Sequence, residues 1–328
     1  MYQVTPFRID VPQSDIDDLT HRLKNTRWTD EPRAAGWNYG TNPQYLRELS
    51  QYWLESYDWR AHEAILNTFP QYHADIEGVK IHFVHVTTGD KPLLLSHGWP
   101  DSFYRFYKVI PLLAEAGFDV IVPSLPGFGF SDKIALNDEE TADIWIKLMS
   151  ALGYQSFFAA GGDMGTGVTK ALANMYPNAV RAIFLTDVGY PSGQEDPGEY
   201  SPSEQQFMKF IQEWIQKEGA YMMEHSTKPQ TLGYALNDSP VGLASWIIEK
   251  FYTWSDCRGN IENCFSKDEL LTNIMIYWVT QTINSSIRSY MVRAQAGMSQ
   301  SMRRVSTPTA VAVFPGEARC RANSRSGW

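Results

Sequence analysis

From residue 92 onward, short apolar runs alternate with amphipathic stretches. The runs at residues 92–96, 120–122, 157–160, 182–185 and 310–314 are predominantly apolar, and the segments between the first four have helical character. Strands that are apolar on both faces belong to a parallel sheet with helices on both sides. The pattern therefore predicts an α/β core.

The region before this core has mainly helical periodicity. Apolar residues recur at helical spacing after Ser14, which forms a capping-box-like start with Asp17, and again after Asn42 and Pro43. Such stripes are typical of helices that pack on another surface. We expect residues 1–91 to form an accessory helical meander around the core.

Between residues 190 and 300 the alternation stops and a helical pattern returns. An insertion this long between two core strands is typical of a cap domain over the substrate site. Its helices are expected at 204–216, 244–251 and 270–282. The predicted domains are the meander at 1–91, the first part of the core at 92–189, the cap at 190–300 and an incomplete second part of the core at 301–328.

The segment Phe-Phe-Ala-Ala-Gly-Gly-Asp-Met-Gly-Thr-Gly at residues 157–167 predicts a strand, a tight turn and a helix, with Asp163 at the apex. Gly161 and Gly165 stand two residues to either side, where such a turn leaves no room for a Cβ. This is the pattern of a nucleophile elbow with Asp in place of Ser. A carboxylate is anionic at neutral pH and attacks carbon directly, which gives an alkyl ester. Taken alone, the pattern is more typical of an ordinary acid in a loop before a helix, so the nucleophile interpretation depends on its context.

A second motif, His-Gly-Trp-Pro at residues 97–100, follows the first strand of the core. The carboxyl ends of parallel strands meet at one edge of the sheet, where ligands bind, so this motif is expected beside Asp163. We expect the backbone N–H groups of Trp99 and Met164 to form an oxyanion hole.

Composition excludes several classes of partner. The formal net charge is −9 and no basic run occurs, which argues against nucleic acid and anionic membranes. Three cysteines form no disulfide framework, so we expect a reducing, cytosolic compartment. We expect neither a membrane anchor nor a signal peptide, because no apolar run approaches the roughly 20 residues that span a bilayer. The 13% aromatic content suits an apolar substrate site.

Six sequence blocks together resemble the microsomal-type epoxide hydrolases of the α/β-hydrolase fold. They lie in the family's order at residues 37–40, 97–102, 161–163, 226–231, 236–244 and 282–286. The resemblance implies an α/β-hydrolase fold with an N-terminal helical meander and a helical cap. It also implies hydrolysis of a small apolar epoxide to a vicinal diol, without cofactor or metal, in detoxification or aromatic hydrocarbon catabolism. A homodimer stays open.

The resemblance also implies the roles of single residues. Asp163 matches the nucleophile, and Tyr221 and Tyr290 match the two tyrosines that assist ring opening. Glu317 matches the acid that orients the catalytic histidine. Met164 stands where the family usually has tryptophan, which changes a side chain but keeps the backbone N–H.

The end of the printed sequence departs further from the family. In α/β-hydrolases the catalytic histidine follows the acid, but residues 318–328 contain none and the last histidine is His225. The family's final strand and helix have no counterpart either, so we expect a core truncated at its C-terminal end, with an unpaired sheet edge and poor solubility. Since hydrolysis of the ester needs a base, we expect the reaction to stall there.

Two other functions stay open. A haloalkane dehalogenase shares the Asp nucleophile, but Met164 and the paired tyrosines disfavour it. A non-catalytic binder or covalent scavenger on the same fold would bind an epoxide without turnover. A serine esterase has the least support, because no G-x-S-x-G motif occurs.

Overall fold

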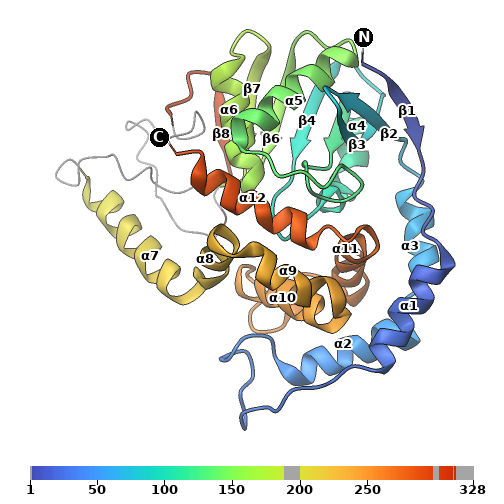
Figure 1. Cartoon of the computed structure of the whole chain (residues 1–328). Coiled ribbons are helices and arrows are strands. Elements are labelled where there is room, and N and C mark those ends of the chain that lie inside the picture. The colour runs from blue at the N-terminus through green and yellow to red at the C-terminus, as the bar shows by residue number, and fades with distance from the viewer. Residues whose placement is uncertain (1, 188–199, 298–302, 313, 315–328) are drawn as a thin grey trace. The chain divides into compact units, whose positions relative to one another are not determined.

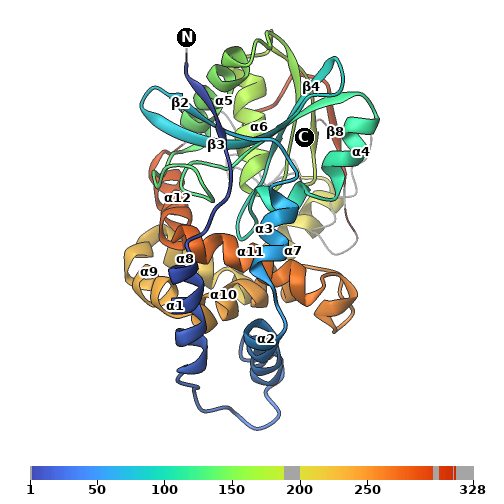
Figure 2. The same cartoon turned by 90° about the vertical axis from the view of Figure 1, so that its right-hand side faces the viewer.

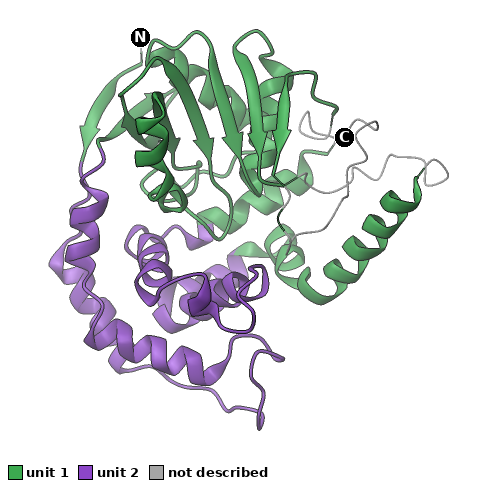
Figure 3. Ribbon diagram, turned by 180° about the vertical axis from the view of Figure 1, so that it is seen from behind, with its two compact units in different colours: residues 1–7, 70–229, 285–328 green, residues 8–69, 230–284 purple. Residues whose placement is uncertain are grey.

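The computed structural model describes residues 2–187, 200–297, 303–312 and 314. The chain forms two compact units, each assembled from segments that are far apart in the sequence (Figure 3). The first unit comprises Met1–Phe7, Pro70–Pro229 and Ser285–Trp328, and the second comprises Arg8–Phe69 and Gln230–Asn284. The four domains predicted from the sequence stay a prediction.

The first unit is built on a mixed sheet, which has eight strands in the described part of the chain (Figure 1). The strand order is β1-β2-β3-β5-β4-β6-β7-β8. Pairing is antiparallel from β1 to β5 and parallel from β5 through β4, β6 and β7 to β8. The strands are β1 (Val4–Phe7), β2 (Gln71–Ile76), β3 (Val79–Val86), β4 (Lys91–Ser96), β5 (Phe118–Pro123), β6 (Phe157–Gly161), β7 (Val180–Leu185) and β8 (Thr309–Val311).

The apolar runs of the sequence form the parallel part of this sheet. Val120, Ile121 and Val122 of β5 are completely buried, because helices cover the sheet on both faces. The predicted α/β core is thereby confirmed. β8 ends at Val311 and is therefore shorter than the run at 310–314, and its residues are exposed at one edge of the described sheet.

The helices of the first unit lie on both faces of the sheet. α5 and α6 pack on each other and on one face, whereas α4 packs against β5 from the other (Figures 1 and 2). The helical elements in the described part of this unit are η1 (Phe103–Phe106), a 3-10 turn, and the α-helices α4 (Val109–Glu115), α5 (Asp138–Ala151), α6 (Met164–Met175), α7 (Pro202–Glu218), α8 (Ala220–Thr227) and α12 (Ile283–Gln295). The first two residues of α12 belong to the second unit.

The described part of the second unit is helical. Its elements are α1 (Gln13–Lys24), α2 (Pro43–Glu55), α3 (Trp59–Leu66), α9 (Pro229–Asp238), α10 (Pro240–Thr253), η3 (Ile261–Asn263) and α11 (Lys267–Thr280). The first residue of α9 belongs to the first unit. Asn42 caps α2 as predicted, because its side chain accepts the N–H groups of Gln44 and Tyr45. α1 packs on α10, and α2 packs on both α10 and α11. The N-terminal helices thus share a core with helices from the long insertion.

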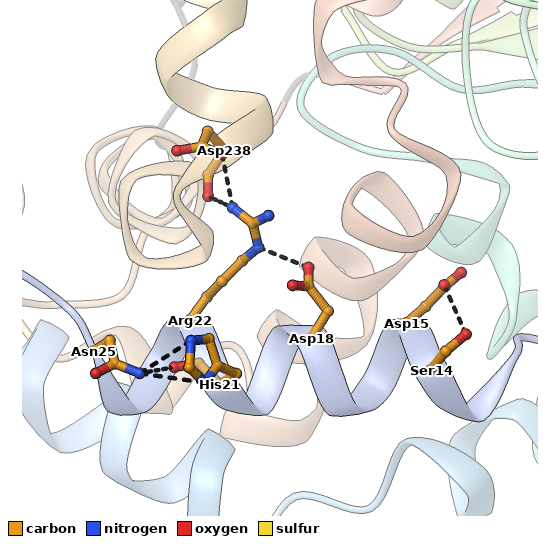
Figure 4. Close-up of polar contacts among 7 residues, drawn as sticks. All are labelled: Ser14, Asp15, Asp18, His21, Arg22, Asn25 and Asp238. Carbon is orange, nitrogen blue, oxygen red and sulfur yellow. Dashed lines mark hydrogen bonds and ion pairs between the residues drawn. The ribbon is translucent and has the colours of Figure 1, made fainter.

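The predicted cap of α1 is wrong. The helix begins at Gln13 after Pro12, whose backbone is extended, so Ser14 falls inside the first turn and its hydroxyl contacts Asp15 instead (Figure 4). At the other end of α1, Arg22 donates to Asp18 at 2.6 Å and to the backbone and side-chain oxygens of Asp238 at 2.7 Å (Figure 4). The hydrogen bonds of this guanidinium join α1 to the end of α9.

Candidate active site

The turn between β6 and α6 carries Asp163 in a conformation that L-residues seldom adopt. Its φ is 56° and its ψ is −125°, which costs on the order of 1–3 kcal/mol and persists only where surrounding contacts enforce it. A Cβ on Gly161 would lie 2.2 Å from the Gly165 oxygen, and one on Gly165 would lie 2.1 Å from the Ser96 oxygen. Both positions therefore require glycine, as the sequence predicted.

Two backbone donors converge on one oxygen of the Asp163 carboxylate. The N–H of Trp99 donates to Oδ1 at 2.8 Å and the N–H of Met164 donates to the same atom at 2.6 Å. These donors meet because β4 and β6 are parallel neighbours, with Ser96 opposite Gly161. The two motifs therefore lie at one edge of the sheet, as expected. The donors stabilise negative charge on any oxygen in that position.

His97 supports the loop that carries Trp99. Its ring is fully buried, its Nε2 accepts the N–H of Leu125 at 3.0 Å, and its Nδ1 lies 3.0 Å from the oxygen of Gly98. Burial lowers the pKa of His97 to about 4, so the ring is neutral at physiological pH. Both ring nitrogens are engaged in holding the loop, which makes His97 a structural residue.

The surroundings of Asp163 make its carboxyl group less acidic than usual. Burial raises its pKa to about 6, the N–H donors of Trp99 and Met164 oppose this, and the charge of Asp187 adds to it. By solvent-accessible surface, however, Asp163 is exposed among the described residues. It is thus crowded by protein atoms yet reachable, and it is mainly ionised at neutral pH.

The two predicted tyrosines lie together beside Trp99. Tyr221 comes from α8 and Tyr290 from α12, and their ring centroids are 5.8 Å apart with planes at 85°. Trp99 stacks on Tyr221 at 5.4 Å and meets Tyr290 edge-on at 6.0 Å. Burial raises the pKa of Tyr290 well above its usual range, and the nearby Tyr221 and Asp163 raise it further. Its phenol therefore keeps its proton at neutral pH.

The structure brings together five of the six residues singled out from the sequence. These are Asp163, Tyr221, Tyr290, Trp99 and Met164. Glu317 lies outside the described residues.

Sequence reasoning missed His225 as a neighbour of these residues. Its buried ring lies 4.7 Å from that of Trp99, 5.5 Å from that of Tyr221 and 4.9 Å from that of Tyr290. Because it follows Tyr221 by one helical turn, the spacing on α8 could have indicated this contact.

Among the described residues, no group of three or more His, Cys, Asp or Glu side chains is arranged so that it could hold a metal ion. None of the helices in the described part of the chain combines the length and the apolar character that crossing a bilayer demands.

The chain is similar to known proteins in both sequence and structure. Residues 4–106 match the family model described as epoxide hydrolase N terminus, and residues 91–221 match the alpha/beta hydrolase fold. The chain is 43% identical to a protein of Stigmatella aurantiaca (strain DW4/3-1) that is named as an epoxide hydrolase, over 96% of this chain and 74% of the relative. It is 38% identical to Epoxide hydrolase 1 of Sus scrofa, over 96% and 78%. The crystal structure of juvenile hormone epoxide hydrolase from the silkworm Bombyx mori superimposes with a TM-score of 0.82 at 32% identity, over 97% of this chain and 82% of that one.

Proposed function

The chain belongs to the epoxide hydrolase family of the α/β-hydrolase fold, and from this premise we propose that Asp163 opens an epoxide by attack on a ring carbon. The carbon–oxygen bond of the ring breaks as a bond forms from carbon to the carboxylate, and the released oxygen takes up a proton. The product of this step is an alkyl ester on Asp163. Water then cleaves the ester to a vicinal diol.

The observation that carries the proposal is the pair of donors on one Asp163 oxygen. Since Oδ1 accepts the N–H groups of both Trp99 and Met164, we assign the attack to Oδ2. Oδ1 then becomes the carbonyl oxygen of the ester. When water adds to this ester, the negative charge develops on Oδ1, where both donors are already in place. One pair of N–H groups thus serves both steps.

Tyr221 and Tyr290 are the proton donors in this mechanism. A phenol offers one O–H, and the raised pKa of Tyr290 keeps that proton available at neutral pH. Proton donation to the departing oxygen contributes about 10²–10⁴-fold to such reactions. The aromatic rings of Trp99 and the two tyrosines favour a small apolar epoxide as substrate.

The hydrolytic half of the cycle needs a base, and the family pattern places that base after Glu317. We assign Glu317 the role of orienting acid on the sequence resemblance alone. Residues 318–328 contain no histidine, so for the polypeptide of residues 1–328 we propose that ester hydrolysis is the slow step. A cytosolic location and a homodimer likewise stay predictions.

The mechanism is tested by incubating the 328-residue polypeptide with styrene oxide and following its intact mass. The expected result is a mass increase of one epoxide, which peptide mapping assigns to Asp163. Asp163→Asn is expected to form no adduct, because its amide is not an anionic nucleophile. Multiple-turnover diol release without an adduct would refute the proposed slow step. An Asp163→Asn chain that reacts as fast as the parent would refute the nucleophile.

The same experiment separates the covalent scavenger from the slow enzyme. If the adduct releases diol over hours after free epoxide is removed, the chain is an enzyme limited by hydrolysis. A permanently stable adduct favours the scavenger. Halide release from a haloalkane at a comparable rate would favour the dehalogenase.

A further inference from the structure

A second carboxylate, that of Asp187, accepts the backbone N–H of the elbow residue, whereas the oxyanion donors bind its side chain. Asp187 stands two residues beyond β7, and its Oδ2 accepts the N–H of Asp163 at 2.7 Å and the hydroxyl of Thr166 at 2.7 Å. The position follows from the sheet, because β7 pairs with β6 in parallel with Leu185 opposite Gly161. The chain beyond β7 therefore passes the turn that follows β6.

Both donors that Asp187 binds belong to the start of α6. Asp163 is the N-cap residue of this helix, and Thr166 lies in its first turn, with its N–H bonded to the oxygen of Asp163 at 3.0 Å. One carboxylate oxygen thus connects the apex of the turn to the helix that follows. Since the φ of Asp163 is 56°, the turn needs external contacts to keep its geometry. Asp187 supplies two of them.

We propose that Asp187 is a positioning residue for the nucleophile: it holds the turn that presents the Asp163 carboxylate and places a second negative charge beside it. The inference rests on the proposed role of Asp163. Attack on an epoxide removes the negative charge from Asp163 and moves it to the ring oxygen. A neighbouring anion therefore disfavours the ionised ground state more than the ester, which speeds the attack.

The charges around Asp163 agree with this arrangement. Asp187 raises the pKa of Asp163, whereas the guanidinium of Arg105, which pairs with Asp101 at 2.7 Å, lowers it. Among the described residues, the titratable and charged groups that face Asp163, its turn or Asp187 are Asp187, Arg105, Asp101, Tyr221, Tyr290, Arg293 and Lys170.

The test measures the rate of adduct formation on the full 328-residue chain with styrene oxide, from about pH 4.5 to about pH 8.5, which brackets the titration of a raised carboxyl group. Asp187→Asn keeps the size of the side chain but removes its charge. The acid limb of the profile is the range in which the rate falls because Asp163 takes up a proton. In the Asp187→Asn chain this limb is expected to move to lower pH by roughly half a unit to one unit. The limiting rate above this limb is expected to fall about tenfold, because the amide is a weaker acceptor for the two donors.

Three variants separate charge from geometry. Thr166→Val removes one hydrogen bond without changing charge, so its rate is expected to fall while the acid limb stays in place. Asp187→Glu restores the charge and is expected to return the limb toward that of the parent. Asp75→Asn is the control, because Asp75 binds the N–H of Gly78 in a distant exposed turn. It is expected to match the parent in both rate and limb.

An Asp187→Asn chain with the rate and acid limb of the parent would overturn the inference. A lower rate that is fully explained by a smaller folded fraction, with an unmoved limb, would overturn it as well. Failure of the proposed function gives a different result, since then the parent forms no adduct on Asp163 and no limb is measured.

Discussion

The guanidinium of Arg293 lies 2.7 Å from the carboxylate of Asp138, which ties α12 to the start of α5. Asp138 also touches α6, since a Cβ on Gly167 would lie 2.4 Å from its Oδ2. Arg293 follows Tyr290 on α12 by about one turn, and its Nη1 lies 3.5 Å from the oxygen of Met164. Arg293 thus connects the helix of Tyr290 to α5 through the ion pair and to the start of α6, next to the nucleophile, through the oxygen of Met164.

Arg293→Met is expected to destabilise the fold. The side chains of Arg293 and Asp138 are only 20% and 12% exposed, so the substitution leaves Asp138 as a largely buried and unpaired charge. Loss of one partner of a buried pair costs about 3–5 kcal/mol, and we expect about 2–4 kcal/mol here because the pair retains some solvent. Urea unfolding of the two proteins measures the difference.

An exposed ion pair of the same unit provides the control. Lys209 and Glu213 are 4.0 Å apart and 78% and 56% exposed, so Lys209→Met is expected to change the free energy of unfolding by less than about 0.5 kcal/mol. Equal losses for Arg293→Met and Lys209→Met would contradict a special role for the Asp138 pair.

The rate of adduct formation is expected to decline in mildly acidic solution. Burial raises the pKa of Asp163 to about 6, and only the ionised carboxylate attacks carbon. The rate should therefore be nearly constant above pH 7, fall to half near pH 6 and drop about tenfold for each further unit. Initial rates of mass increase in a series of buffers measure the profile. A midpoint near pH 4, the ordinary range of aspartate, would contradict the crowded environment of this carboxyl group.

The features predicted correctly from the sequence depend on local constraints. Buried parallel strands must be apolar on both faces, so the strands from β4 to β7 were visible as apolar runs. The elbow was visible because Gly161 and Gly165 each approach a backbone oxygen too closely for any Cβ. One boundary was predicted wrongly. The helix α1 begins at Gln13, directly after Pro12 with its fixed φ, and not after the expected cap at Ser14.

Contacts that depend on sheet register or on helix packing could not be predicted this way. Asp187 reaches the elbow only because β7 lies beside β6 in one particular register. Arg293 meets Asp138 only through the packing of α12. Nor does periodicity single out Tyr221 and Tyr290 among the 17 tyrosines. They were found through resemblance to a family, and their ring contact is a property of the folded chain.

Removal of either phenolic hydroxyl is expected to slow ring opening without disturbing the packing. Tyr221→Phe and Tyr290→Phe keep the rings that contact Trp99. Each variant loses a proton donor and the hydrogen bond between the two phenols. We expect each single variant to lose about tenfold or more in the rate of adduct formation, and the double variant to lose about 10²–10⁴-fold.

Tyr234→Phe is the matched control for these variants, because Tyr234 is 72% exposed. It is expected to react as the parent does. Unchanged rates for both single variants and for the double variant would remove the tyrosines from the mechanism.

Gly98→Ala is expected to block the nucleophile while the protein stays folded. The added Cβ would lie 2.3 Å from Oδ1 and 2.4 Å from Cβ of Asp163, so the carboxylate must turn away from the N–H groups of Trp99 and Met164. We expect a loss of about 100-fold in the rate of adduct formation, the effect of removing oxyanion-type donors. Gly242→Ala is the control, since its nearest neighbour is the Ser239 side chain at 3.2 Å, near the start of α10. Circular dichroism and urea unfolding check that both variants fold. A folded Gly98→Ala chain that reacts at the parental rate would show that Asp163 does not need this position to attack.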